Sequence, residues 1–117
     1  MLAHDFICTK EENIPVALNF FPEKKLLKAE MKHITVKDKW IREYYKLFNG
    51  LTLYNCSGRK INSLAYYGIT LIPPESCLML LKRIKHKGFM IRIRLNKLIC
   101  ILSYSLDNHL FIVHWGI

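Results

Sequence analysis

Long hydrophobic runs are missing from this sequence of 117 residues. Its apolar stretches, such as Leu98–Leu102, do not exceed five residues, whereas a helix needs about 20 apolar residues to cross a bilayer. The first ten residues also lack the basic flank and apolar run of a secretory signal. We therefore expect no segment that crosses a membrane, no membrane partner, and a cytoplasmic protein.

Cysteine and glycine are too sparse to build two common kinds of site. The four cysteines lie at least 21 residues apart in the chain, and structural zinc needs at least one close pair of ligands. Five dispersed glycines do not form a glycine-rich loop that binds phosphate. We therefore expect free thiols, no metal and no cofactor. Two of the thiols fall in apolar stretches and are expected to be small core residues, Cys77 and Cys100.

Catalytic motifs are also missing. The nine acidic residues show no pairing suited to acid–base catalysis, and no serine lies in the strained turn that exposes a nucleophile. The one close histidine pair, His109 and His114, lies on a predicted strand, where residues five apart point to opposite faces. We interpret His114 as a core or edge histidine. The sequence predicts a protein that is not an enzyme.

Positive charge is what the sequence has in excess. It carries 18 Lys and Arg against nine Asp and Glu, a formal net charge of +9. Residues 1–58 carry nine basic and seven acidic side chains, whereas residues 59–117 carry nine basic and only two acidic ones, Glu75 and Asp107. Such a field attracts an acidic protein surface or a phosphate backbone. The second half is therefore expected to carry the binding surface.

The first half of the chain is expected to be helical. Pro22 opens a candidate helix that runs to about His33, because proline suits the first helical position. A second helix is predicted over Val36–Phe48, where apolar residues recur at helical spacing and Asn49-Gly50 supplies a left-handed stop. Within it, Trp40 is expected to be largely buried.

The second half is expected to be richer in strands. Short strands are predicted at Leu51–Tyr54 and within Ser63–Ile72, and a third helix is predicted from Pro73-Pro74 to Gly88. The alternation that follows predicts a C-terminal three-stranded meander with strands at Phe89–Leu95, Leu98–Tyr104 and His109–Trp115. Residues 1–117 are therefore expected to form a single α+β domain, with about three helices packed on a mostly antiparallel sheet.

Three segments resemble a known family. The run from Trp40 to Leu51, which ends a helix in Asn49-Gly50, resembles the helix-then-Asn-Gly signature of the SUKH superfamily. Ala29-Glu30 is similar to the early Ala-Glu pair of that family, and Leu71–Ser76 to its later proline-containing helix start. Many members are bacterial immunity proteins that neutralise polymorphic toxins. The resemblance implies a fold closed by strands and a function exerted by protein–protein contact.

Two features depart from the family pattern. The usual Leu-Pro before the Asn-Gly helix is replaced by Ile34-Thr35-Val36. The chain is also basic, whereas immunity proteins against basic nucleases are typically acidic. The resemblance therefore implies that the toxin presents an acidic surface to this protein, or that its inhibition relies on shape rather than charge.

The leading interpretation is a cytoplasmic immunity protein that binds and neutralises a cognate bacterial toxin domain. The alternative is a small basic nucleic-acid-binding protein of phage or mobile-element origin, whose affinity would fall steeply as salt rises. The same side chains are candidates for partner binding in either case, because Arg and Tyr are enriched at interface hot spots: Arg59, Lys60, Tyr66, Tyr67, Arg92, Arg94 and Lys97.

Overall fold

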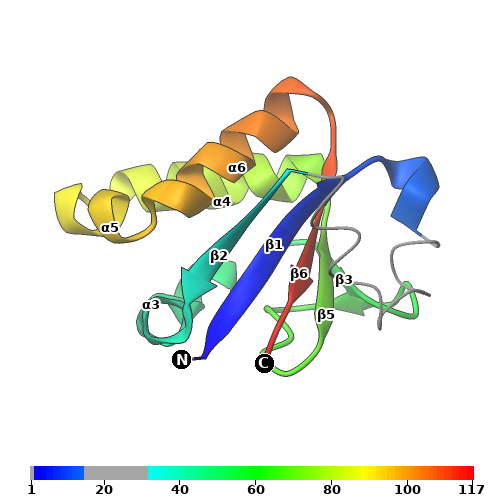
Figure 1. Cartoon of the computed structure of the whole chain (residues 1–117), viewed down its shortest axis with the longest axis horizontal. Helices are drawn as coiled ribbons and strands as arrows, with labels where there is room; N and C mark the ends of the chain where they lie inside the picture. The colour runs from blue at the N-terminus through cyan, green and yellow to red at the C-terminus, as the bar shows by residue number, and fades with distance from the viewer. Residues whose placement is uncertain (1, 15–31) are drawn as a thin grey trace.

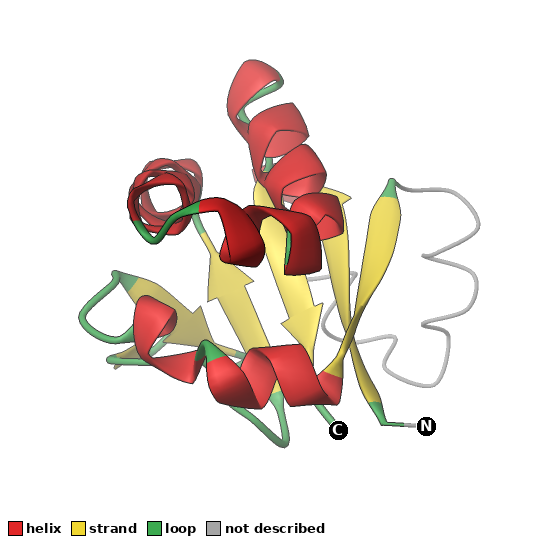
Figure 2. Cartoon of the chain, turned by 90° about the vertical axis from the view of Figure 1, so that its left-hand side faces the viewer, coloured by secondary structure: helices red, strands yellow, loops and turns green. Residues whose placement is uncertain are grey.

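The computed structural model describes residues 2–14 and 32–117 and shows an α+β fold (Figure 1). An antiparallel six-stranded sheet carries the described α-helices on one of its faces, as Figure 2 shows. The expected α+β class is therefore confirmed. The helix predicted from Pro22 lies outside the described residues, apart from its expected end at His33, which instead begins a strand.

The sheet is built from six strands that all pair antiparallel with their neighbours, in the order β2-β1-β6-β5-β3-β4. Their bounds are β1 Ala3–Thr9, β2 His33–Lys37, β3 Leu53–Asn55, β4 Lys60–Ile61, β5 Ile69–Ile72 and β6 Phe111–Trp115. The strands expected within Ser63–Ile72 and at His109–Trp115 are thus confirmed with shorter bounds. The strand expected at Leu51–Tyr54 is present but shifted to Leu53–Asn55. Strands β1, β2 and β4 were not expected from the sequence.

The central strands β1 and β6 are buried on both faces. Phe6 and Ile112 belong to the main core under the helices, whereas Ile7 and Val113 belong to a second cluster on the opposite face. A strand buried on both faces has a continuous apolar pattern rather than an alternating one. This is why the short run around Phe6 gave no strand signal by alternation.

The second predicted helix is present but shorter and broken. Val36 belongs to β2, α3 spans Asp38–Glu43, and a 3₁₀ turn, η3, spans Tyr45–Phe48. Gly50 has φ +77°, so the expected left-handed stop is confirmed. Trp40 is only half-buried, which corrects the expectation of a core position. Its ring lies under two cations, Lys39 and Arg94, at the protein surface.

The third predicted helix is confirmed as α4, which spans Pro74–His86. Proline at its first turn and basic residues in its last turn suit the two ends of a helix dipole. The side chains of Cys77, Leu80 and Ile84 are completely buried, while Gly88 follows the helix at φ +107°. The apolar face of α4 thus packs onto the sheet.

The predicted C-terminal meander is wrong in its first two strands. Residues 89–94 form helix α5, Phe89–Arg94, and residues 96–107 form helix α6, Asn96–Asp107. The buried residues of this stretch recur at helical spacing: Ile91, Leu95, Leu98, Ile101 and Leu102. Over a few residues, an apolar pattern can fit the two-residue period of a strand as well as the 3.6-residue period of a helix. The helix forms here because it packs this apolar stripe against α4 and the sheet.

The helical form of this stretch also changes one further expectation. Cys100 is exposed on α6, whereas Cys77 is buried as expected. None of the helices in the described ranges is long and apolar enough to cross a membrane.

Candidate partner-binding surface

The seven residues predicted to bind a partner lie in three separate places. Arg59 and Lys60 lie at the β3–β4 edge of the sheet, and Tyr66 and Tyr67 lie in the loop before β5. The remaining three lie around the junction of α5 and α6, at the opposite end of the molecule from β3 in Figure 1: Arg92, Arg94 and Lys97. The structure therefore does not gather them into one patch.

Two of the arginines form contacts within the fold. Arg94 Nη1 lies 3.1 Å from Glu43 Oε2 and donates to Tyr44 Oη at 2.9 Å. The hydrogen bond to Tyr44 is the main cause that raises the pKa of Arg94. Arg92 Nη2 donates to the Lys85 carbonyl at 2.9 Å, near the end of α4. Both side chains thus hold α5 in place, on α3 and on α4.

The two tyrosines differ in how far they are available to a partner. The Tyr66 hydroxyl donates to Asp38 Oδ1, and burial together with this hydrogen bond raises the pKa of Tyr66 to about 12. Tyr67 packs edge-on against the Tyr66 ring, with 4.8 Å between ring centroids, and is 79% exposed. Tyr67 is therefore the tyrosine that a partner reaches most readily.

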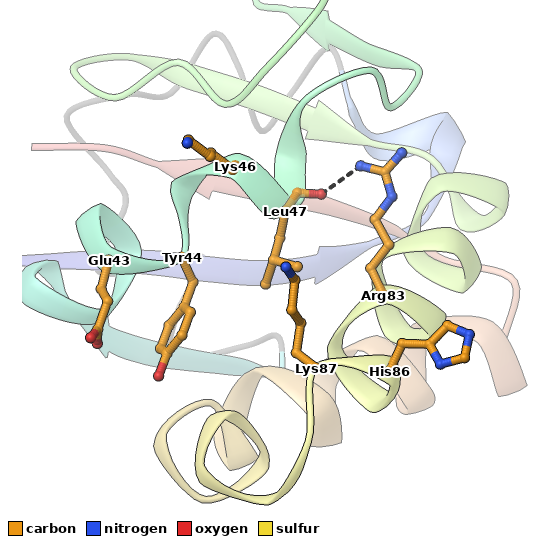
Figure 3. Close-up of a pocket in the computed structure, with 7 residues that line it drawn as sticks. All are labelled: Glu43, Tyr44, Lys46, Leu47, Arg83, His86 and Lys87. Atoms are coloured by element: carbon orange, nitrogen blue, oxygen red, sulfur yellow. Dashed lines mark hydrogen bonds between the residues drawn. The ribbon is translucent and has the colours of Figure 1, made fainter.

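A pocket of about 470 Å³ lies between η3 and the C-terminal half of α4 (Figure 3). Leu47 and Tyr44 give it apolar surface. Its charged and titratable lining is mostly basic: Lys46, Arg83, His86, Lys87 and one acid, Glu43. Since Glu43 is already paired with Arg94, the pocket has a positive field.

Arg83 is the fixed member of this basic lining. Its Nη1 donates to the carbonyls of Leu47 at 2.7 Å and Asn49 at 2.6 Å, which ties α4 to the end of η3 (Figure 3). Two bonds from one nitrogen hold the guanidinium in a defined position, so little side-chain entropy remains to be lost when an anion binds. Lys46 and Lys87 are exposed and add longer, more adaptable charges.

The sequence did not single out these pocket residues. Arg83 and Lys87 lie at the end of a predicted helix, where the helix dipole alone explains basic side chains. Lys46 lies on the other wall, separated from them by almost 40 residues of chain. Only the packing of η3 against α4 brings these charges together.

A second cluster of polar side chains is buried under α3. His4 Nδ1 lies 2.8 Å from His114 Nε2, and His4 Nε2 lies 2.9 Å from Asp38 Oδ1. Both histidines are completely buried, so the interpretation of His114 as a core histidine is confirmed. Burial lowers the pKa of His114 to about 3. The hydrogen bond from Tyr66 lowers the pKa of Asp38; burial opposes this effect and the hydrogen bond with His4 adds to it. The cluster links β1, β6, α3 and the Tyr66 loop.

The polar cluster has features of a structural network rather than a reaction centre. Its histidines are closed to solvent, whereas a catalytic group must reach a substrate. Among residues 2–14 and 32–117, no group of three or more His, Cys, Asp or Glu side chains is arranged to hold a metal ion. The basic pocket is therefore the stronger candidate site. No protein-family model, curated protein or solved structure matches the chain.

Proposed function

We propose that the protein is a cytoplasmic immunity protein, related to the SUKH superfamily, that neutralises a cognate bacterial toxin domain by direct contact. The observation that supports this proposal is the basic pocket between η3 and α4, in which a fixed Arg83 lies near two exposed lysines, Lys46 and Lys87. The toxin as partner rests on the sequence resemblance around Trp40–Leu51.

The pocket suits an acidic side chain of a partner protein. Arg83 offers a positioned guanidinium, which binds carboxylates more specifically than a lysine does. Tyr44 and Leu47 offer apolar surface on which the methylene groups of an Asp or Glu side chain pack. A partially enclosed site makes such a charge pair stronger than one on open surface, because water screens it less. An acidic toxin surface is the partner that this arrangement favours.

The test is protection of bacteria that express a candidate toxin, chosen from the genes that neighbour this one. Lys46→Glu combined with Lys87→Glu reverses two pocket charges, so we expect slower association with the purified toxin and loss of protection. Lys10→Glu is the matched control, because Lys10 is also exposed but follows β1 at the other end of the molecule. Equal protection by the pocket variant and the wild-type chain would refute the proposal.

Nucleic-acid binding is the second candidate, and one observation favours it. Residues 76–106, which include most of α4, all of α5 and all of α6 except its last residue, Asp107, carry seven basic side chains and no acidic one. This alternative predicts tight binding to random DNA or RNA oligonucleotides that weakens steeply with salt. Such binding, together with no protection against the toxin, would replace the immunity proposal.

A further inference from the structure

Helix α5 exposes three large apolar side chains. Phe89 is 75%, Met90 56% and Ile93 53% exposed, while Ile91 between them is 3% exposed and packs in the core. The strand expected here would have placed Phe89, Ile91 and Ile93 together on a buried face. The helix instead buries Ile91 and leaves the other three in water. A cluster of this kind on a soluble surface marks an interaction site.

The chain holds α5 in a fixed position. The chain turns sharply out of α4 at Gly88, whose φ of +107° is a backbone conformation that only glycine adopts readily. Arg92 bonds back to the Lys85 carbonyl, and Arg94 bonds to Glu43 and Tyr44. Figures 1 and 2 show α5 at one end of the molecule, beyond the sheet. The exposed apolar side chains are therefore presented on a positioned, protruding helix.

The charge around α5 is mostly positive, and the acidic side chain that contacts the helix, Glu43, is paired with Arg94. Lys85 and Lys87 precede the helix, Lys97 follows it, and all three are exposed. With no acidic residue from 76 to 106, no negative side chain of this stretch offsets them. Apolar groups surrounded by cations match a surface that is apolar inside and anionic outside.

We propose that α5 docks on the anionic surface of a phospholipid bilayer, with Phe89, Met90 and Ile93 entering the interface and the flanking lysines contacting lipid phosphates. This contact is peripheral and differs from the proposed toxin binding, although Lys87 belongs to both surfaces. Each Lys or Arg near such a surface strengthens binding about fivefold. No membrane partner was expected, because the apolar runs of the sequence are too short to cross a bilayer. A helix that lies on the bilayer surface needs no such run.

A bilayer fits this surface better than a protein or a nucleic acid. Protein interfaces usually combine charges of both signs to fix one orientation, whereas here the exposed charges that flank α5 in the chain are lysines, and the neighbouring Glu43 is already paired with Arg94. Nucleic acids offer phosphate and stacking surface but no apolar interior for the aliphatic side chains of Met90 and Ile93. A lipid interface accepts all three side chains without a preformed recess.

The test measures co-sedimentation of the full chain with large vesicles. We expect binding to vesicles of equimolar phosphatidylcholine and phosphatidylglycerol, and much weaker binding to phosphatidylcholine alone. The double variant Phe89→Ser with Ile93→Ser should bind anionic vesicles about tenfold more weakly or worse, and Lys85→Gln and Lys97→Gln about fivefold more weakly each. Tyr67→Ser is the control, because Tyr67 is equally exposed but lies in the loop before β5.

A second measurement keeps the proposal testable if the double variant folds poorly. In the variant Phe89→Trp, the fluorescence emission should shift to the blue on anionic vesicles and should be quenched by brominated lipids, because the indole enters the interface. No binding of the wild-type chain to anionic vesicles would overturn the proposal. So would unchanged vesicle binding by the double serine variant, or a preference for polyglutamate or random oligonucleotides that depends on Phe89 and Ile93.

Discussion

Acidification from pH 7 to pH 5 should destabilise this protein through His114. The imidazole is completely buried, lies against the Phe6 ring with 5.0 Å between centroids, and lies 2.8 Å from His4. Burial, and to a smaller extent the nearby His4, lowers the pKa of His114 from 6.5 to about 3, against a small opposing effect of Asp5. Because the folded pKa is depressed, the unfolded chain takes up the proton first, and stability falls as the pH drops below 6.5.

The size of the effect follows from the same shift. Each pH unit below the unfolded pKa costs about 1.4 kcal/mol until the folded pKa is reached. At pH 5 the loss from His114 is therefore about 2 kcal/mol, and it continues to grow towards pH 3. Asp38 does not add to this loss of stability between pH 7 and pH 5. Its pKa in the folded state is lowered, so the stability that it contributes is lost only as the pH falls below 3.8.

Urea denaturation followed by fluorescence measures this loss. The wild-type chain should lose about 2 kcal/mol of unfolding free energy between pH 7 and pH 5, and His114→Gln should lose less, although it is less stable at pH 7. His86→Gln serves as the control, because His86 is exposed and lies outside the buried histidine cluster. Identical pH dependence in the wild-type chain and in His114→Gln would refute the reasoning.

Three other outcomes follow from burial and close packing. Trp40→Ala should reduce the unfolding free energy by roughly 2 kcal/mol in urea denaturation, less than a fully buried tryptophan would, because Trp40 is half-buried under Arg94. Gly116→Ala should cost about 1–3 kcal/mol in the same assay, because a Cβ there would lie 2.1 Å from the Tyr66 carbonyl oxygen. Titration with Ellman's reagent at pH 8 should modify two thiols rapidly in the native protein, the exposed Cys56 and Cys100. Cys8 and Cys77 should react only on unfolding, because burial raises the pKa of Cys8 to about 12 and that of Cys77 to about 11.

The elements that the sequence predicted well are those with strong local signals. Helix α4 has proline at its first turn, basic residues at its last turn and a regular apolar stripe, and it was found with nearly correct bounds. The stretch after Gly88 gave an ambiguous signal, since Phe89–Leu95 alternates while also placing Ile91 and Leu95 one helical turn apart. Contacts with distant residues settle that choice, and a local pattern does not contain them.

The candidate site was harder to predict than the fold. The positive charge in the second half of the chain did not point to the pocket, because Lys46 comes from the first half and the basic end of α4 was explained by the helix dipole. Arg94 looked like a solvated strand residue and is instead bound to Glu43 and Tyr44. Reversing its charge should therefore weaken the fold as well as any association with a partner.

The pairing of β1 with β6 constrains how the chain reaches its native state. Ile7 lies opposite Val113, so the centre of the sheet joins residues more than 100 positions apart. Contacts of such high sequence separation slow folding, because a long loop must close before they form. Until β6 is in place, the edges of β1 and β5 have unpaired backbone groups that are free to pair with another chain. A chain cut after Asn108 should therefore aggregate rather than persist as a soluble partial fold.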